Sequence, residues 1–216
     1  KNKFLYRTEV INTEYLTYFN NDIQYGAKYI FKRLMDITLS IILLFVFLPI
    51  IVIIILYIYF LDSSPVIVKQ KRVGLHGKVF SMYKFRTMKK DSHELRKELS
   101  NLNKNTGPLF KIENDPRIID GALVLRKYSL DDLPQLFNVL KGDMSLVGPR
   151  PLFYEDTEYF DKDYMRRLNV LPGITGLLQI NERNTSDFDI WYKYDIEYIK
   201  NWSLYSDVKI LLKTPY

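Results

Sequence analysis

A long apolar block dominates the pattern of hydrophobic and polar positions along the chain. It runs from Leu34 to Leu61, and Asp36 near its start is its only charged residue. The block is longer than the roughly 20 residues that a membrane-spanning helix needs. It is too long and lies too far from the first residue for a secretory signal peptide, and no small-residue cleavage site follows it. We therefore expect a membrane helix; the alternative is a helix buried in a protein core.

The flanks of the block indicate how it meets the membrane. Basic residues lie on both sides, namely Lys28, Lys32 and Arg33 before it and Lys69, Lys71 and Arg72 after it. Because basic flanks favour the cytoplasmic side, both ends are assigned to the cytoplasm. Pro49, near the middle, removes a helix hydrogen bond and favours a bend. The pattern predicts a re-entrant hairpin broken at Pro49; the alternative is a proline-kinked span.

Shorter patterned segments follow. The runs 66–73 and 79–85 are rich in β-branched and aromatic residues and flank two glycines, so they predict a β-hairpin. A charged helix is expected over about 91–101, where Asp91 and Glu94 resemble a capping pair.

A further helix is expected over about 130–140, with apolar residues on one face and a stop at Lys141-Gly142. Between Trp191 and Tyr205, aromatic residues alternate with lysines, which favours either helices at the membrane interface or an aromatic core. The expected fold class is α+β, with a re-entrant membrane hairpin, a small β-hairpin and a helical cytosolic domain that carries interfacial helices. Its expected divisions are an N-terminal interfacial segment over 1–31, the membrane hairpin over 32–62 and the cytosolic domain over 63–216.

Composition limits the partners and the metal site. The 216 residues carry a formal net charge of +6 and include no cysteine and 2 histidines, His76 and His93. Without cysteine there is neither a disulfide framework nor a thiolate site, so any metal is expected to be a hard cation held by carboxylates. The positive charge suits a polyphosphate, a nucleic acid or an anionic membrane. We expect no nucleic-acid partner, because no nucleic-acid-reading motif accompanies the apolar block.

Two adjacent carboxylates, Asp131 and Asp132, stand where the 130–140 helix is expected to start. In one interpretation Ser129 and Asp132 form a capping box and the acids complement the helix dipole. Pro134 weakens this interpretation, because its nitrogen cannot donate a hydrogen bond in the first turn, so regular helix begins later. In the other interpretation the aspartates lie on an irregular turn that a ligand can reach. One is then a nucleophile, and its neighbour holds Mg²⁺ or handles a proton.

Arginines accompany this acidic pair. Arg126 precedes it, Arg150 follows it, and Arg183 lies further along the chain. Each alone is more often a surface residue, but arginine binds phosphate oxygens through two parallel hydrogen bonds. Attack on a diphosphate needs charge neutralisation of this kind, so the set favours phosphate chemistry.

Ordered motifs carry a resemblance to a known family. They are Lys32–Asp36, the apolar block with Pro49, Lys84–Met88, Ser129–Gln135, Gly142–Pro151, Pro172–Gly176 and Asp207–Thr214. With these motifs over most of its length, the chain resembles the monotopic phosphoglycosyl transferases of bacterial glycan assembly, often called the bacterial sugar transferase family.

The resemblance implies a reaction. Asp131 corresponds to a nucleophilic aspartate that takes a hexose phosphate from a UDP-sugar, releases UMP and passes the sugar phosphate to undecaprenyl phosphate. This is the priming step of polysaccharide or glycoconjugate assembly. Mg²⁺ is expected beside Asp131 and Asp132. The segment Gly107–Lys111 is similar to that of members that use hexoses such as glucose or galactose.

The resemblance also implies a location and a set of contacts. The expected substrate-binding residues are Lys84, Arg86, Arg126, Arg150 and Arg183. The expected partners are the UDP-sugar, undecaprenyl phosphate and membrane lipids, and a homodimer is left open. The protein is expected in the bacterial plasma (inner) membrane with its catalytic domain on the cytoplasmic face. Larger members carry an additional domain ahead of the hairpin, which this sequence is expected to lack.

Departures from the family pattern leave a second function open. Asp132 stands where the family usually has Glu, Ile118–Ala122 replaces a Thr-Arg-x-Gly pattern, and Leu171 replaces an arginine. Lost contacts to metal or phosphate would make the chain a non-catalytic membrane scaffold in a glycan-assembly complex. A third alternative is a membrane-anchored nucleic-acid-binding protein, which the absence of a stacking motif disfavours.

Overall fold

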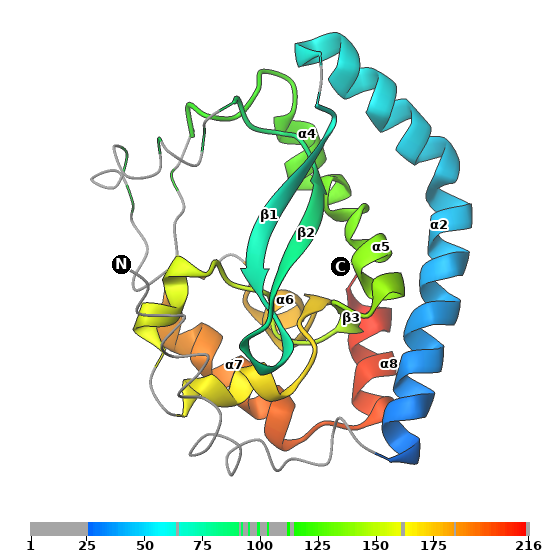
Figure 1. Cartoon of the computed structure of the whole chain (residues 1–216), viewed down its shortest axis with the longest axis vertical. Coiled ribbons are helices and arrows are strands. Elements are labelled where there is room, and N and C mark those ends of the chain that lie inside the picture. The colour runs from blue at the N-terminus through cyan, green and yellow to red at the C-terminus, as the bar shows by residue number, and fades with distance from the viewer. Residues whose placement is uncertain are drawn as a thin grey trace.

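A long helix lies along a domain of short helices and two small sheets (Figure 1). The computed structural model describes residues 26–63, 65–90, 92, 95, 99, 103, 112, 115–160, 163–183 and 185–214. Its mixture of helix and sheet confirms the coarse α+β expectation. Besides the long helix, the helical elements are α4 (Leu123–Lys127), η4 (Leu130–Asp132), α5 (Gln135–Lys141), η5 (Glu155–Tyr159), η6 (Tyr164–Asn169), α6 (Leu177–Asn181), α7 (Phe188–Lys200) and α8 (Leu204–Lys213).

The long helix, α2, spans Ala27–Asp62 and contains Pro49. Its 36 residues give a length of about 54 Å, beyond the ~30 Å of a bilayer's hydrocarbon core. It is long and apolar enough to cross a membrane. In Figure 1 it curves along one side of the molecule, but its first and second halves do not fold back on each other as in a hairpin. The long apolar helix that the sequence predicts is thus present, while the re-entrant hairpin stays a prediction.

The amino end of α2 is fixed to the domain by buried polar contacts. The ammonium of Lys32 lies 2.6 Å from Asp207 on α8 and donates to the carbonyl of Val147 at 3.2 Å. One turn later, the carboxylate of Asp36 accepts from the backbone amide of Leu146 at 3.1 Å. Because Lys32, Asp36 and Asp207 are all buried, these contacts hold the helix against the domain interior.

The carboxyl end of α2 is fixed as well. Arg86 lies 2.9 Å from the carboxylate of Asp62 and also donates to the carbonyls of Asp62 and Ser63. The hydroxyl of Tyr57 donates to the carbonyl of Gly121 at 3.1 Å, beside α4. Near these contacts, a small apolar core joins the helix to the domain through Ile54, Ile58, Phe85 and Leu125. Apolar side chains remain exposed on α2, among them Ile41, Phe45, Val46, Ile53 and Phe60.

The predicted β-hairpin is confirmed. Strands β1 (Ile67–Val73) and β2 (Val79–Phe85) pair antiparallel in continuous register from Ile67↔Phe85 to Val73↔Val79. A short turn, η2 (Leu75–Gly77), joins them, with His76 and Gly77 at positive φ. Because the β-branched runs and the glycines are local signals, the sequence alone was sufficient to predict this element.

A second sheet pairs strands that are distant in the sequence. Strands β3 (Ser145–Val147) and β4 (Gly173–Thr175) run parallel. A Cβ on Gly173 would lie 2.1 Å from the nitrogen of Gly148, so both positions need glycine for the backbones to approach. The segment 149–152 follows β3 directly and so is held close to β4.

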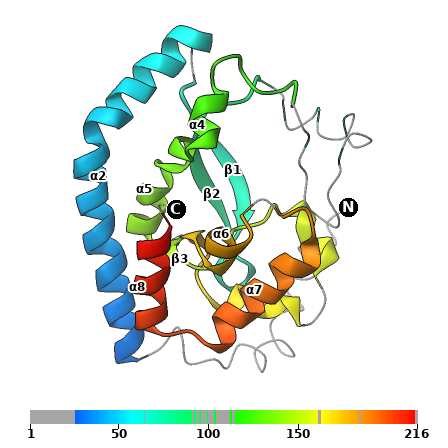
Figure 2. The same cartoon turned by 180° about the vertical axis from the view of Figure 1, so that it is seen from behind.

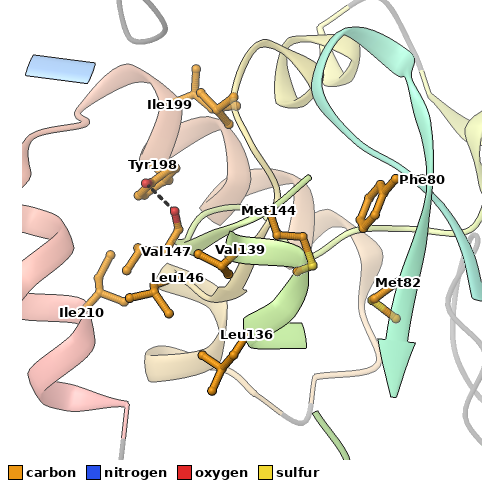
Figure 3. Close-up of a cluster of buried hydrophobic side chains, with 11 residues drawn as sticks. Phe80, Met82, Leu136, Val139, Met144, Leu146, Val147, Tyr198, Ile199 and Ile210 are labelled. Carbon is orange, nitrogen blue, oxygen red and sulfur yellow. Dashed lines mark hydrogen bonds between the residues drawn. The ribbon is translucent and has the colours of Figure 1, made fainter. Parts of the chain in front are cut away.

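The main core gathers side chains from five elements, as Figure 3 shows: Phe80 and Met82 from β2, Leu136 and Val139 from α5, Leu146 and Val147 from β3, Tyr198 and Ile199 from α7, and Ile210 from α8. The hydroxyl of Tyr198 lies 3.0 Å from the carbonyl of Val147 and 2.9 Å from the carboxylate of Asp207, so its one proton has an acceptor inside the core. This core fixes β2 and α5 relative to each other. The turn that carries the acidic pair precedes α5 and packs against β2.

The aromatic residues near the end of the chain mostly face the protein. Tyr198 is buried, Trp202 packs against the main core, and Trp191 and Tyr192 pack on a second core. Tyr205 is 77% exposed. Figure 2 shows α7 and α8 on the face opposite the β-hairpin. The aromatic-core alternative therefore accounts for most of these residues, and interfacial helices stay a prediction.

Some expectations fall outside the described part of the chain or need revision. Residues 1–25 and most of the charged helix expected over 91–101 lie outside it. The helix expected over 130–140 divides into η4 and α5, and Phe137, one of its apolar residues, is 48% exposed. Gly142 ends α5 in the left-handed conformation, as the predicted stop requires.

Candidate active site

The two aspartates lie on an irregular turn, η4, ahead of the regular helix. Ser129 has φ 53° and makes no side-chain cap hydrogen bond, so the capping-box interpretation is wrong. Its left-handed backbone differs from the extended conformation that an N-cap residue normally has. Regular helix begins only at Gln135, after Pro134, as the missing proline N–H led us to expect.

Lys84 bridges the acidic pair. Its ammonium lies 3.3 Å from Oδ2 of Asp131 and 2.6 Å from Oδ1 of Asp132. Lys84 comes from β2, which packs against η4 and α5. All three side chains are mostly buried, with exposed fractions of 14%, 7% and 12% for Lys84, Asp131 and Asp132. An ammonium in this position offsets the repulsion between neighbouring carboxylates.

Asp132 has further partners. The side-chain amide of Gln135 donates to its Oδ1, and Nη2 of Arg150 lies 3.9 Å from its Oδ2. Sequence reasoning missed Gln135 as a site residue. Its position three residues after Asp132, on the next helical turn, was the available signal. Asp132 is thus held from several sides, whereas Asp131 contacts Lys84 at the longer distance.

The two carboxyl groups differ in their electrostatics. Burial raises the pKa of Asp131 above its ordinary value; Lys84 opposes this shift and the charge of Asp132 adds to it. Burial also acts to raise the pKa of Asp132, but attraction to Lys84, Arg150 and Arg72 outweighs it, so this pKa is lowered. Asp132 is therefore the more readily ionised member, and added positive charge would favour ionisation of Asp131.

The predicted arginines differ in where they lie. Arg183, which follows α6, donates to the hydroxyl of Ser129 and so lies beside the turn that carries the acidic pair. Arg126 is exposed, contacts the hydroxyl of Thr87 at 3.4 Å and acts on the charge of Asp131. Arg150 faces Asp132. Together these guanidinium groups place positive charge around the acidic pair.

Arg86 lies elsewhere. It is buried, at 3% exposed, and its guanidinium is engaged by the carboxyl end of α2. Arginine is a favourable partner for the free carbonyls at a helix C-terminus. Substrate binding by Arg86 stays a prediction, and the contacts present assign it to anchoring α2.

A family model described as bacterial sugar transferase matches residues 27–216. The chain belongs to the bacterial sugar transferase family. Its curated relatives include galactosyl transferase CpsE of Streptococcus agalactiae, 49% identical over 154 residues, which are 71% of this chain and 34% of the relative. The undecaprenyl-phosphate galactose phosphotransferase of Salmonella typhimurium is 42% identical over 219 residues, covering 98% of this chain and 44% of the relative. Exopolysaccharide production protein ExoY of Rhizobium meliloti is 37% identical over 187 residues, 85% of this chain and 83% of the relative.

This bacterial sugar transferase spans less than half the length of the first two relatives. Its departures from the family pattern fit their surroundings. The shorter side chain of Asp132 still reaches Lys84 and Gln135. Leu171 is 4% exposed, and Ile118 forms an isolated bridge with Met88. These positions are accommodated by packing, and the acidic pair with its basic partners is retained.

Proposed function

We propose that this bacterial sugar transferase moves a hexose-1-phosphate from a UDP-sugar to undecaprenyl phosphate at the cytoplasmic face of the plasma membrane. The relative named undecaprenyl-phosphate galactose phosphotransferase supports the acceptor and the sugar class. The observation that carries the proposal is the mostly buried pair Asp131 and Asp132 bridged by Lys84 at 3.3 and 2.6 Å. Such a pair, surrounded by arginines, suits a carboxylate nucleophile working on a diphosphate.

The proposed reaction has two displacements at one phosphorus. An oxygen of Asp131 attacks the phosphorus next to the sugar, the bond from that phosphorus to the bridging oxygen breaks, and UMP leaves with that oxygen. An oxygen of undecaprenyl phosphate then attacks the same phosphorus, and Asp131 leaves as a carboxylate. The lipid carries away the sugar joined through a new diphosphate, and the enzyme returns to its starting state.

The contacts support Asp131 as the nucleophile. Asp132 is held by Lys84, Gln135 and Arg150, which leaves it little freedom to approach phosphorus. Asp131 has the looser contact with Lys84, at 3.3 Å. As phosphate enters, Lys84 and Arg150 can bind its oxygens and help to offset the charge that develops there.

Mg²⁺ fits the donor set. No group of three or more His, Cys, Asp or Glu side chains that could hold a metal occurs in the described part of the chain. Mg²⁺ usually takes one or two carboxylates and completes its coordination with substrate phosphates and water. Asp131 and Asp132 would hold it, and it would supply charge neutralisation for the diphosphate.

Chelation tests the metal. Detergent-solubilised protein with a UDP-sugar is expected to release no UMP in excess EDTA and to recover when Mg²⁺ is added back, because two carboxylates and the arginines must jointly offset the donor's charge. Ca²⁺ is the informative comparison, since its longer bonds and looser geometry match a phosphate site less well. Full UMP release in EDTA, with no gain on adding Mg²⁺, would exclude the metal role.

The attachment of α2 supports a same-side membrane topology. Lys32 near its start and Asp62 at its end both contact one domain. A domain of folded polar loops does not extend through a bilayer, so both ends of the helix belong to the side that holds the domain. The exposed apolar side chains of α2 would then enter the lipid from that side.

Cysteine labelling tests this topology cleanly, because the chain has no cysteine of its own. Single cysteines in place of Lys28 and of Lys69 are each expected to resist an impermeant thiol reagent in intact cells and to react after lysis. Both residues are exposed, so neither replacement disturbs the core. If one cysteine reacts in intact cells while the other does not, α2 crosses the bilayer and the re-entrant arrangement is wrong.

One assay tests the whole proposal. Solubilised protein is mixed with undecaprenyl phosphate, Mg²⁺ and a panel of UDP-sugars, and UMP is measured. Release with one UDP-hexose and transfer of its sugar phosphate to the lipid are expected. A stable, folded protein that releases no UMP with any donor would favour the scaffold alternative.

A further inference from the structure

The loop that presents Arg150 is held along its whole backbone. Each carbonyl from Pro149 to Leu152 accepts a hydrogen bond from another part of the chain: Pro149 from the amide of Gly173 at 2.9 Å, Arg150 from the guanidinium of Arg167, Pro151 from the guanidinium of Arg72 at 3.2 Å, and Leu152 from the amide of Val73 at 3.1 Å. The prolines on either side of Arg150 also restrict φ. The side chain of Arg150 is 38% exposed and ends 3.9 Å from Asp132. The partly exposed side chain of Arg150 thus extends from a backbone that hydrogen bonds hold in place.

Among the groups that donate to this loop, Arg167 is unusual because it is a buried charge. Its side chain is 4% exposed, and its guanidinium lies 3.0 Å from the carboxylate of Asp195 on α7. The same oxygen of Asp195 accepts a hydrogen bond from the hydroxyl of Tyr164 at 2.9 Å. The rings of Phe160 and Tyr164 lie 5.4 and 4.9 Å from the guanidinium carbon. A charged group is therefore buried among aromatic rings, with one carboxylate and one backbone carbonyl as partners.

Burying such a charge is costly, and an apolar residue of similar size would serve packing alone at least as well. What an apolar residue cannot do is bind the carbonyl of Arg150. Phosphate recognition by arginine depends on the angle of its planar fork, so small movements of the loop would misplace both hydrogen bonds.

We propose that Arg167 is a positioning residue: through its hydrogen bond to the carbonyl of Arg150, and its own fixation by Asp195 and Tyr164, it holds the Arg150 guanidinium where the diphosphate meets Asp132. The role rests on the proposed function. It is distinct from any contact of Arg167 with substrate, because the side chain is only 4% exposed and its guanidinium is bound to Asp195 and to the loop carbonyl.

A double-mutant cycle distinguishes positioning from general structural support. Arg167→Lys keeps a positive charge but, with its shorter reach, loses the guanidinium whose Nη2 contacts both the carbonyl of Arg150 and the carboxylate of Asp195. It is expected to lower kcat for UMP release about 10-fold or more when Arg150 is present. In an Arg150→Ala background the same change is expected to cost less than about 2-fold, since nothing remains to be positioned. Equal losses in both backgrounds would overturn the proposal.

Arg166→Lys is the matched control. Arg166 is the neighbouring arginine on η6, is 39% exposed and pairs with Asp163 at 3.3 Å at the surface. It is expected to keep the wild-type rate. If Arg167→Lys fails to fold, Tyr164→Phe replaces it in the cycle, because it removes the hydroxyl that fixes Asp195 and keeps the aromatic packing. A Tyr164→Phe loss that persists unchanged without Arg150 counts equally against the proposal.

Hydrogen exchange separates this inference from the proposed function. Without substrate, the amides of Gly173 and Val73, which bind the loop, are expected to exchange faster in Arg167→Lys than in the wild type and to be unchanged in Arg166→Lys. A wild-type protein that releases no UMP contradicts the proposed function. Hydrogen exchange then tests by itself whether Arg167 holds the loop. Unchanged exchange at both amides in Arg167→Lys shows that Arg167 does not hold the loop, whatever the activity.

Discussion

Asp131→Asn is expected to abolish turnover, lowering the rate of UMP release by at least about 1,000-fold. Asparagine keeps the shape of the side chain and its place on η4, but it cannot supply the anionic oxygen that forms the bond to phosphorus. With wild-type protein and no acceptor, UMP should appear in a burst equal to the enzyme concentration. Intact-protein mass spectrometry should then show one added hexose phosphate, and Asp131→Asn should show neither burst nor adduct.

Matched variants make this result specific. Asp120→Asn changes an exposed carboxylate of the same domain and is expected to leave the burst unchanged. Asp132→Glu introduces the residue usual in the family, so folding and adduct formation should survive. An adduct that persists in Asp131→Asn and vanishes in Asp132→Asn would reverse the assignment of the nucleophile.

Local signals were sufficient to predict much of the frame around this site. The β-hairpin follows from β-branched runs on either side of a glycine-containing turn, and those signals lie within a few residues of the structure they specify. Pro134 likewise fixes where regular helix can begin, because its nitrogen carries no proton. The irregular turn under Asp131 and Asp132 was predictable for the same reason.

The sequence was not sufficient at the site where contacts between residues far apart in the chain determine the local structure. Ser129 has a good capping sequence, yet its backbone is left-handed, and its hydroxyl accepts from Arg183 instead. Lys84 meets the aspartates only because β2 packs against η4, a contact across 47 positions of sequence. No local pattern could rank Lys84 above Arg86, two residues away, although the first reaches the acidic pair and the second anchors α2.

The charged residues at the start of the long apolar helix carry a similar lesson. By hydropathy alone, Lys32 belongs to the basic flank and Asp36 is a charged exception within an apolar run. In the structure they are buried and bind the domain, so they locate α2 against α8 and β3. The chemistry of a flank can thus be read from sequence, but its partner cannot.

The Lys32–Asp207 pair is expected to give the largest effect on stability. The two charges lie 2.6 Å apart with side chains 4% and 0% exposed. The hydroxyl of Tyr198 and the indole N–H of Trp202 also lie within hydrogen-bond distance of the Asp207 carboxylate, at 2.9 and 3.1 Å. Lys32→Met keeps the length and apolar stem of the side chain, so it removes the charge with little loss of packing. It leaves a buried carboxylate without its counter-ion, which typically costs about 3–5 kcal/mol.

For a chain of this size that loss corresponds to a melting temperature lower by about 10 °C, which tryptophan fluorescence in detergent can measure. Lys28→Met, the same substitution at an exposed position one turn earlier on α2, is expected to melt within about 2 °C of the wild type. In the double variant Lys32→Met with Asp207→Asn, the unpaired charge is gone while a carbonyl oxygen remains for Tyr198. This protein should therefore melt above Lys32→Met alone. Equal melting temperatures for Lys32→Met and Lys28→Met would show that the buried pair does not hold α2 to the domain, because an uncompensated carboxylate in that interior cannot be neutral in its cost.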